Sequence, residues 1–477
     1  MAKLLTTERG GRKLILNGYA YVLKKKTSAK MVWDCDQRKS RKCNGSASTA
    51  LVVSEGDTVV ECGEHNHERD PAKEEIIRGK NVLKRKATES VESTDAIVSE
   101  VVGGTTILAA GGLTRVETMK RNVRRYRSSK FGPSPKFISE LIIPEEFKQT
   151  KDGKDFMLLD EFYGDGTRVI AFGTKSNLEK LKSCNFWMAD GTFAVAPTLF
   201  SQLYTVHGLV GGEGFPFIYA LLMDKKKESY LRLFGRISAM ISDIFDETPA
   251  VDVIVTDFEQ AAISAMDQVF NRGVEATLLH GCFFHLRQAI QRRVQECGYK
   301  GLYESNLEFK TKVKMVGALA FVRGHEVLNY YLQLERLFAL QESEVGKAAL
   351  NILRYFGRIY VGIDDQGRNM TPMFPVKFWN NVLLTESDFP CTNNIVEGWN
   401  HRFSLRVGHA HPNVWKLFEA IQNEQEYMER YYEMVISGNG KTAQKKYEGI
   451  HERLKQTVGL FGSVPFDVYL RGIANNF

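Results

Sequence analysis

The chain has 477 residues, of which 43% are hydrophobic and 25% charged, which is typical of a water-soluble globular protein with two or three domains. No apolar run reaches the roughly eighteen residues of a transmembrane helix, and residues 1–10 lack a signal-peptide layout, so we expect neither a membrane-spanning nor a secreted protein. Seven cysteines, an odd number, argue against a disulfide framework and favour a reducing compartment.

Positive charge is concentrated at the amino-terminal end. Residues 1–135 contain 26 Lys and Arg against 16 Asp and Glu, whereas the rest of the chain contains 38 against 41. A basic front end on a slightly acidic body indicates that the front end binds a polyanion. A basic linker that only keeps the protein in solution is the alternative. A membrane surface is disfavoured, because no basic amphipathic helix with aromatic anchors is evident.

Residues 5–67 are predicted to form short β-strands, because apolar, β-branched and aromatic residues alternate between turn sequences. This small segment also holds two thiols and two imidazoles, a complete tetrahedral set for a structural zinc ion: Cys35, Cys43, His65 and His67. Cys62 is a candidate to replace one of these four ligands. Free cysteines beside an exposed "EHNH" turn are the alternative interpretation.

The same segment resembles a FLYWCH-type zinc finger. The resemblance rests on "RGGRKLILNGYAYVLKK", on "WDC" with Trp33, on the second cysteine and on the closing "HNH". The family's leading Phe is not evident, and Tyr19 and Tyr21 supply the aromatic positions. Such fingers are similar to β-rich WRKY-type DNA readers, so the resemblance implies DNA binding.

Basic side chains of this segment then form a candidate phosphate-binding set, which we expect to give salt-dependent affinity more than sequence choice. A solvated strand edge is the alternative. The set comprises Lys24, Lys25, Lys26, Arg38, Lys39, Arg41 and Lys42.

Residues 68–135 are of mixed charge and rich in Ser, Thr and Gly, and predict a basic, partly helical linker that ends at "GPSP". Its clusters Lys84–Lys86 and Lys120–Arg127 are candidate nuclear-import signals or further DNA contacts, which predicts a nuclear protein.

Residues 136–300 alternate strands and helices. Three apolar strands in a row ("NFWMADGTFAVAP", "FSQLYTVHGLVGG", "FPFIYALLMDKK") are followed by a helix, the strand "VDVIVTDF", a helix, the strand "ATLLHGCFF" and a basic helix. This order predicts a mixed α/β sheet. Residues 301–385 look mostly helical, and a last helical stretch begins near Thr392.

Three carboxylates occupy positions that suit chemistry better than packing. Asp190 lies in the first of these strands, and Asp257 ends "VDVIVTD", at the carboxyl end of a buried strand. Glu397 lies one turn inside a helix that Thr392 or Asn393 could cap. Paired carboxylates are tolerable when divalent cations neutralise them, and two such ions can activate a water and stabilise a leaving phosphodiester oxygen.

Each acid also has a simpler explanation as a turn former, a helix cap or a residue that interacts favourably with the positive end of a helix dipole. Glu386 and Asp388 are rivals for the third position, and Glu259 is interpreted as a helix-opening residue. Cys282 and His285, three residues apart where a strand becomes a helix, are half of a zinc site or a buried thiol with a satisfied imidazole, and their role stays open.

Residues from about 155 to 405 resemble the Mutator-like element (MULE) transposase domain, a member of the retroviral-integrase and ribonuclease H-like superfamily. The motifs appear in the family's order: "FMLLDEFYGDGTRVIAFGT", "LEKLKSCNFWMADGTF", "VIVTDFEQAAISAM", "GCFFHLRQAI" and "TNNIVEGWNHRF". The resemblance implies that Asp190, Asp257 and Glu397 are catalytic ligands of Mg²⁺ or Mn²⁺. It also implies a Cys-x-x-His pair after the second Asp.

The expected architecture is an α/β ribonuclease H-like core with a helical insertion, behind a small β-rich zinc finger. The predicted boundaries are 1–70 for the finger, 71–135 for the linker, 136–300 for the first part of the core, 301–385 for the insertion and 386–477 for the helices with the last acid.

The expected function is a transposase that binds terminal inverted repeats and target DNA, cleaves, and transfers strands. It implies a homodimer or higher oligomer, because two DNA ends must be joined. The alternatives are a domesticated nuclear DNA-binding regulator that no longer cuts and a structure-selective nuclease of the same fold.

Overall fold

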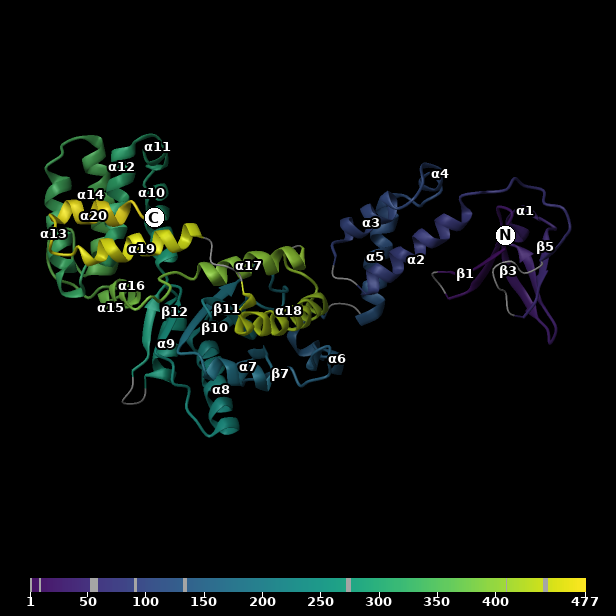
Figure 1. Cartoon of the computed structure of the whole chain (residues 1–477), viewed down its shortest axis with the longest axis horizontal. Helices are drawn as coiled ribbons and strands as arrows, with labels where there is room; N and C mark the ends of the chain where they lie inside the picture. The colour runs from purple at the N-terminus through teal and green to yellow at the C-terminus, as the bar shows by residue number, and fades with distance from the viewer. Residues whose placement is uncertain are drawn as a thin grey trace. The chain divides into compact units, whose positions relative to one another are not determined.

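The computed structural model describes residues 2–7, 10–51, 59–89, 92–131, 135–271, 276–408, 410–440 and 445–477. It divides into two compact units, built mainly from the residues up to Pro135 and from those that follow (Figure 1). The fold is mixed α/β, with a β-rich amino-terminal sheet, a second sheet and many helices. None of the helices in these described ranges is long and apolar enough to cross a membrane.

The first unit begins with a six-stranded antiparallel sheet whose strands follow chain order. Its core is built from inward-facing residues such as Leu14, Tyr21 and Trp33, all fully buried. A short helix, α1 (Arg38–Arg41), follows the fourth strand. The strands are β1 (Lys3–Thr6), β2 (Arg12–Leu16), β3 (Tyr19–Lys26), β4 (Met31–Cys35), β5 (Ser46–Thr49) and β6 (Val60–Cys62).

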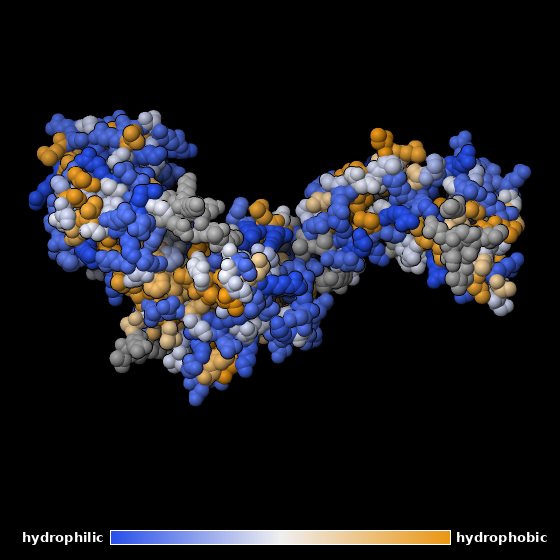
Figure 2. Space-filling view, viewed as in Figure 1, coloured by the Kyte–Doolittle hydropathy of each residue, from blue (hydrophilic) through white to orange (hydrophobic). Residues whose placement is uncertain are grey.

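The segment predicted as a partly helical linker is more ordered than expected. It forms α2 (Lys73–Glu89), α3 (Thr94–Gly103), α4 (Ile107–Ala110) and α5 (Val116–Phe131). Apolar residues at helical spacing, including Ile97, Val98 and Val101, pack with Leu83 and Val123 into a core of their own. Ile107 and Leu108 of α4 stay exposed and form an apolar tip (Figure 2).

The second unit contains a seven-stranded sheet in the order β13-β12-β9-β10-β11-β8-β7. The strands β9, β10 and β11 are antiparallel neighbours, β12 is parallel to β9, and β13 is parallel to β12. The strands β7 and β8, which come earlier in the chain, form an antiparallel hairpin at one edge of the sheet. The bounds are β7 (Met157–Phe162), β8 (Arg168–Phe172), β9 (Phe186–Thr192), β10 (Gln202–Val210), β11 (Glu213–Leu222), β12 (Val253–Thr256) and β13 (Leu278–Gly281).

Helices cover both faces of this sheet. Trp187 of β9 packs with Leu233 and Ile237 of α8 and with Met266 of α9 on one face. On the other face, Phe186 and Met188 of β9 pack in the core that contains Val396 of α17. The connecting helices are η1 (Ile138–Glu140), α6 (Glu145–Lys148), α7 (Lys175–Lys182), α8 (Lys227–Phe245), α9 (Gln260–Phe270) and α10 (Phe283–Glu296).

A separate helical core lies beside the sheet, where α19 and α20 return to pack with α11–α14 (Figure 1). Leu286, Val316, Leu334, Leu353 and Leu470 meet in it, although they span nearly two hundred residues of sequence. The helices are α11 (Lys300–Ser305), α12 (Leu307–Ala318), η2 (Leu319–Phe321), η3 (Gly324–Glu326), α13 (Val327–Ala339), α14 (Glu344–Phe356), η4 (Gly357–Val361), α15 (Val376–Trp379), α16 (Val382–Glu386), α17 (Asn394–Val407), α18 (Val414–Met434), η5 (Val435–Asn439), α19 (Lys445–Gly459) and α20 (Phe466–Ala474).

Candidate functional site

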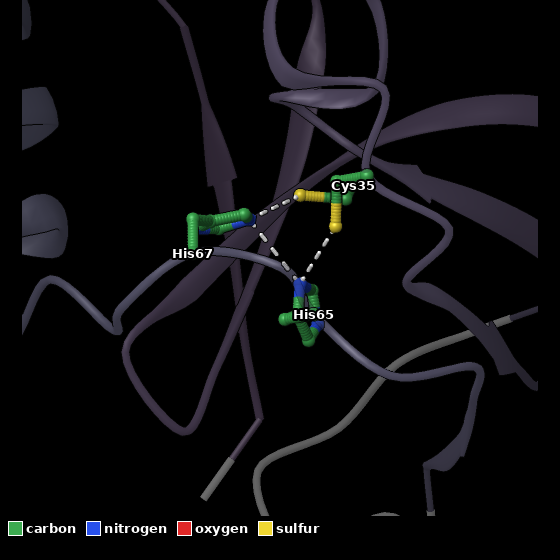
Figure 3. A group of neighbouring side chains, drawn as sticks. Cys35, His65 and His67 are labelled. Carbon is green, nitrogen blue, oxygen red and sulfur yellow. Dashed lines mark hydrogen bonds between the residues drawn. The ribbon is translucent and has the colours of Figure 1, made fainter.

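Two clusters of ionisable side chains are candidate sites, one in each unit. In the first unit, Cys35, Cys43, His65 and His67 each offer a ligand atom, and these atoms all lie within 4.8 Å of one another. Cys35 ends β4, and both histidines follow β6 (Figure 3).

The separations between these atoms suit one zinc ion. Cys35 Sγ lies 3.2 Å from His67 Nε2, Cys43 Sγ lies 3.3 Å from His65 Nδ1, and His65 Nδ1 lies 3.3 Å from His67 Nε2. Zinc bonds of about 2.0–2.3 Å at tetrahedral angles place ligand atoms roughly 3.3–3.8 Å apart. The four residues can therefore bind Zn²⁺, and Cys62, which is exposed, is outside the cluster.

The ring nitrogens that do not face the cluster also have partners. His65 Nε2 lies 2.9 Å from the Tyr21 hydroxyl, which donates to Glu61 at 2.7 Å. His67 Nδ1 lies 3.0 Å from the carbonyl oxygen of Glu68. Such contacts fix the tautomer and orientation of a metal-binding histidine. The sequence did not identify these residues as supports of the histidines. It indicated only that tyrosines supply the aromatic positions of the finger.

The protonation states in this cluster are compatible with a bound cation. Burial raises the pKa of Cys35 to about 11, and burial together with the neighbouring His67 lowers the pKa of His65. The imidazole therefore stays neutral and able to bind a metal at neutral pH. A cation would supply the charge that turns the buried thiol into a thiolate.

The predicted phosphate-binding residues are all exposed, on β3, on α1 and directly after α1. Lys24 and Arg38 both pair with Asp34, at 3.4 and 3.1 Å. For the other five, the described part of the chain provides no carboxylate partner: Lys25, Lys26, Lys39, Arg41 and Lys42. In the helical clusters, Lys86 pairs with Glu92 and Glu100, and Lys120 pairs with Asp95.

The second cluster lies where β9 and β12 run side by side. Val255 of β12 is opposite Met188 of β9 in the parallel pair. Asp257 lies two residues beyond Val255, and Asp190 two beyond Met188, so both acids are at the same level. Because side chains alternate along a strand, Asp190 belongs to the face whose core includes Met188 and Val255, and the charge of Asp257, directly after β12, acts on Asp190.

Helix α17 brings the third acid to this face. Val396 belongs to the same core, and Glu397 is the next residue, in the first turn of the helix. The Asn393 backbone oxygen accepts from the Glu397 N–H at 2.8 Å, but the Asn393 side chain makes no hydrogen bond and does not cap the helix. Asn400, one turn further along, donates to Asp190 Oδ2 at 2.9 Å.

The charges of the other two acids act on Asp190. Burial, with the charges of Asp257 and Glu397, raises the pKa of Asp190 to about 8, and Asp190 is only 6% exposed. Burial raises the pKa of Glu397 to about 7, and its Oε1 atom is buried without a hydrogen-bond partner. The backbone N–H of Glu259 donates to Asp257 at 3.1 Å.

The Cys-x-x-His pair lies against this cluster. His285 Nε2 is 3.8 Å from Glu397 Oε1, and Cys282, His285 and Glu397 form a second group whose ligand atoms lie within 4.8 Å. The rival acids lie elsewhere. Glu386 pairs with Arg323 at 2.6 Å, and Asp388 is exposed and pairs with Lys455 at 2.6 Å.

Glu259 directly precedes α9, as its interpretation as a helix-opening residue implies, but its side chain is also placed near the acids. It accepts a hydrogen bond from Tyr230 at 2.9 Å, and burial raises its pKa, with Asp257 adding to that effect.

Comparison with protein families identifies two domains. Residues 4–67 match the FLYWCH zinc finger domain, and residues 186–289 match the MULE transposase domain, as the sequence resemblance predicted. No curated protein and no solved structure matches the chain. The first match contains the four zinc-binding residues, and the second contains Asp190, Asp257, Cys282 and His285. Together the two domains indicate a transposase-related, DNA-binding function.

Proposed function

We propose that this chain, with its FLYWCH zinc finger domain ahead of a MULE transposase domain, is a cut-and-paste DNA transposase. In this proposal Asp190, Asp257 and Glu397 are the catalytic acids. The observation that supports it is that the charges of Asp257, directly after β12, and Glu397, in α17, both act on the buried carboxyl group of Asp190 in β9. The proposed domain boundaries are those predicted from the sequence.

The topology supports a ribonuclease H-like core. Three antiparallel strands are followed by two parallel strands that are reached through α8 and α9. The acids at the ends of the adjacent strands β9 and β12 occupy the position where open α/β sheets carry their sites.

The same residues fit divalent cations. Burial raises the pKa of Asp190, and the charges of Asp257 and Glu397 raise it further. The Oε1 atom of Glu397 is buried and accepts no hydrogen bond, and His285 Nε2 lies 3.8 Å from it. Hard cations such as Mg²⁺ or Mn²⁺ prefer oxygen ligands of this kind.

Each side chain then has a defined task. Asp190 and Asp257 would hold both ions between neighbouring strands, and Glu397 would complete the second ion's ligands from α17. Asn400 keeps one oxygen of Asp190 oriented through its 2.9 Å hydrogen bond. When bound, a pair of ions lowers the pKa of a water and stabilises the leaving oxygen of a phosphodiester. In the first reaction, water would attack a phosphorus at the element's end, and the broken P–O bond would leave a free 3′-hydroxyl. In the second, this 3′-hydroxyl would attack a phosphorus of the target DNA and displace the 3′-oxygen of the target strand.

The zinc finger would recognise the terminal inverted repeat. Its exposed lysines and arginines supply the salt-dependent phosphate contacts, with Lys25, Lys26, Lys39, Arg41 and Lys42 available because no carboxylate among the described residues neutralises them. The basic clusters on α2 and α5 would direct the protein to the nucleus, and the joining of two ends calls for a homodimer or higher oligomer.

A cleavage assay on DNA that carries the sequences flanking the coding gene tests this proposal. With Mg²⁺ or Mn²⁺, the natural protein should nick at the element's end, and Asp257→Asn should reduce the rate by at least about a thousandfold, because lost transition-state stabilisation of about 4 kcal/mol has that effect. Asp243→Asn, on the exposed surface of α8, is the matched control and should cut normally.

Equal cutting by Asp257→Asn and the natural protein would refute the assignment of that residue. DNA binding without cutting in the natural protein would favour the domesticated regulator, as would the absence of matching inverted repeats beside the gene. Cutting that depends on DNA structure and not on the end sequence would favour a structure-selective nuclease.

A further inference from the structure

Cys282 lies where two elements of the proposed site meet. It directly precedes α10, and its backbone N–H donates to the oxygen of Thr256 at 2.8 Å, the residue before Asp257. Its Sγ atom accepts the backbone N–H of Asn393 at 3.1 Å, the residue that directly precedes α17. One residue is therefore bonded both to the strand end before the second acid and to the helix start before the third.

These two bonds are shielded from water. Cys282, Thr256 and Asn393 are all fully buried, so a lost protein hydrogen bond cannot be replaced by solvent there. The N–H of Asn393 is one of the donors that a helix start leaves without an intrahelical partner. Because the Asn393 side chain makes no hydrogen bond, the thiol of Cys282 is what engages this helix start.

Neighbouring contacts extend the same junction. The N–H of Phe283 donates to the oxygen of Cys391 at 3.0 Å, so two consecutive residues at the start of α10 hold the segment that leads into α17. One turn along α10, His285 lies 3.8 Å from Glu397. Through Cys282, the Cys-x-x-His pair therefore contacts the backbone next to the acids. Through His285, it lies near the carboxylate of Glu397.

We propose that Cys282 is a positioning residue that sets the separation between Asp257 and Glu397 by holding the end of β12 and the start of α17 together. This inference rests on the proposed function, because it assumes that the two acids share divalent cations. A role in packing alone is the alternative, because Cys282 also belongs to the apolar core around Phe186 and Val255. Loss of packing would lower stability without changing the affinity for a metal in the folded protein.

Three variants of the full chain separate these roles. Cys282→Ala removes the acceptor, whereas Cys282→Ser keeps an acceptor atom at the same place. Cys184→Ala is the matched control, because Cys184 is also buried, and its thiol bonds only within its own segment, to the oxygen of Lys180 at 3.2 Å. For each protein, binding of Mn²⁺ without DNA is measured by electron paramagnetic resonance, together with the melting temperature and the Mn²⁺ dependence of end cleavage.

Cys282→Ala should weaken Mn²⁺ binding at the acids by about tenfold or more, the usual effect of losing a group that supports metal ligands, and should raise the Mn²⁺ concentration needed for cleavage equally. Cys282→Ser should recover most of the affinity. Cys184→Ala should lower the melting temperature but leave Mn²⁺ binding unchanged.

Two results would overturn the inference. If Cys282→Ala bound Mn²⁺ as Cys184→Ala does while Asp257→Asn lost binding, the positioning role would be wrong and the proposed function would stand. If Asp257→Asn also bound Mn²⁺ normally, the proposed function itself would fail, and the positioning role with it.

Discussion

Tyr21 links a zinc-binding histidine to a carboxylate. Its hydroxyl lies 2.9 Å from His65 Nε2 and donates to Glu61, while its ring is fully buried in the core of the first sheet. The sequence predicts four zinc ligands, because two thiols and two imidazoles in a small segment have few other uses, and the structure brings these four residues together. It could not predict Tyr21 or Glu61 as their support, because those contacts depend on how β3 and β6 are placed in the folded sheet.

Tyr21→Phe should weaken zinc binding with little change in the apolar core. Removing the hydroxyl leaves the ring in place but deprives His65 of the group that orients it, so we expect about a tenfold loss of Zn²⁺ affinity. Competition with a colorimetric chelator measures this affinity. Tyr163→Phe, which removes a similar hydroxyl bonded to Glu161 at 2.8 Å in the other unit, should have no effect. Equal zinc affinities for all three proteins would contradict the role of Tyr21.

The acids illustrate how far residue-level prediction reached. Asp190 and Asp257 occupy equivalent positions in "FWMAD" and "VIVTD", so the register of β9 and β12 puts them at the same level once these strands are neighbours. The pairing of these strands depends on long-range contacts, as does the approach of Glu397, about 140 residues after Asp257. No local sequence pattern predicts either of them. Only the family resemblance connected the three.

Elements with strong periodicity were predicted well. The strands β9 to β13 and the helices α8, α9 and α10 form where alternating or helical apolar spacing indicated them. The segment 68–135 was read as a linker because its glycines and serines obscure the helical spacing of Ile97, Val98 and Val101, which in fact pack in a core. The return of α19 and α20 to the helical core depends on tertiary packing that no local pattern reveals.

The six-stranded sheet of the first unit should depend on zinc, whereas the seven-stranded sheet should not. The small sheet has a limited core, and a structural ion adds stability that such a segment needs. A zinc-selective chelator should therefore abolish amide-hydrogen protection in residues 12–35 and 59–67 and leave β9 to β13 protected in hydrogen-exchange mass spectrometry. Adding Zn²⁺ should restore the protection. Persistent protection of β2 to β4 after zinc removal would show that the ion is dispensable for folding.

At the scale of the whole molecule, we propose that the basic first unit recognises DNA and that the acids of the second unit bind the cations. The two units have separate hydrophobic cores, so a change in one need not unfold the other. Family comparison supports each unit independently, since the two matches cover different parts of the chain. The proposed reaction therefore needs both DNA recognition by the first unit and metal-dependent chemistry in the second.

The most direct test of this chemistry is a crystal of the protein soaked in Mn²⁺ and examined by anomalous scattering. We predict peaks about 2.1 Å from carboxylate oxygens, with Asp190 and Asp257 contacting both ions and Glu397 one of them. Bound Mn²⁺ that avoids these three side chains, or a centre that stays empty at millimolar Mn²⁺, would contradict the assignment of these acids as the cation-binding centre.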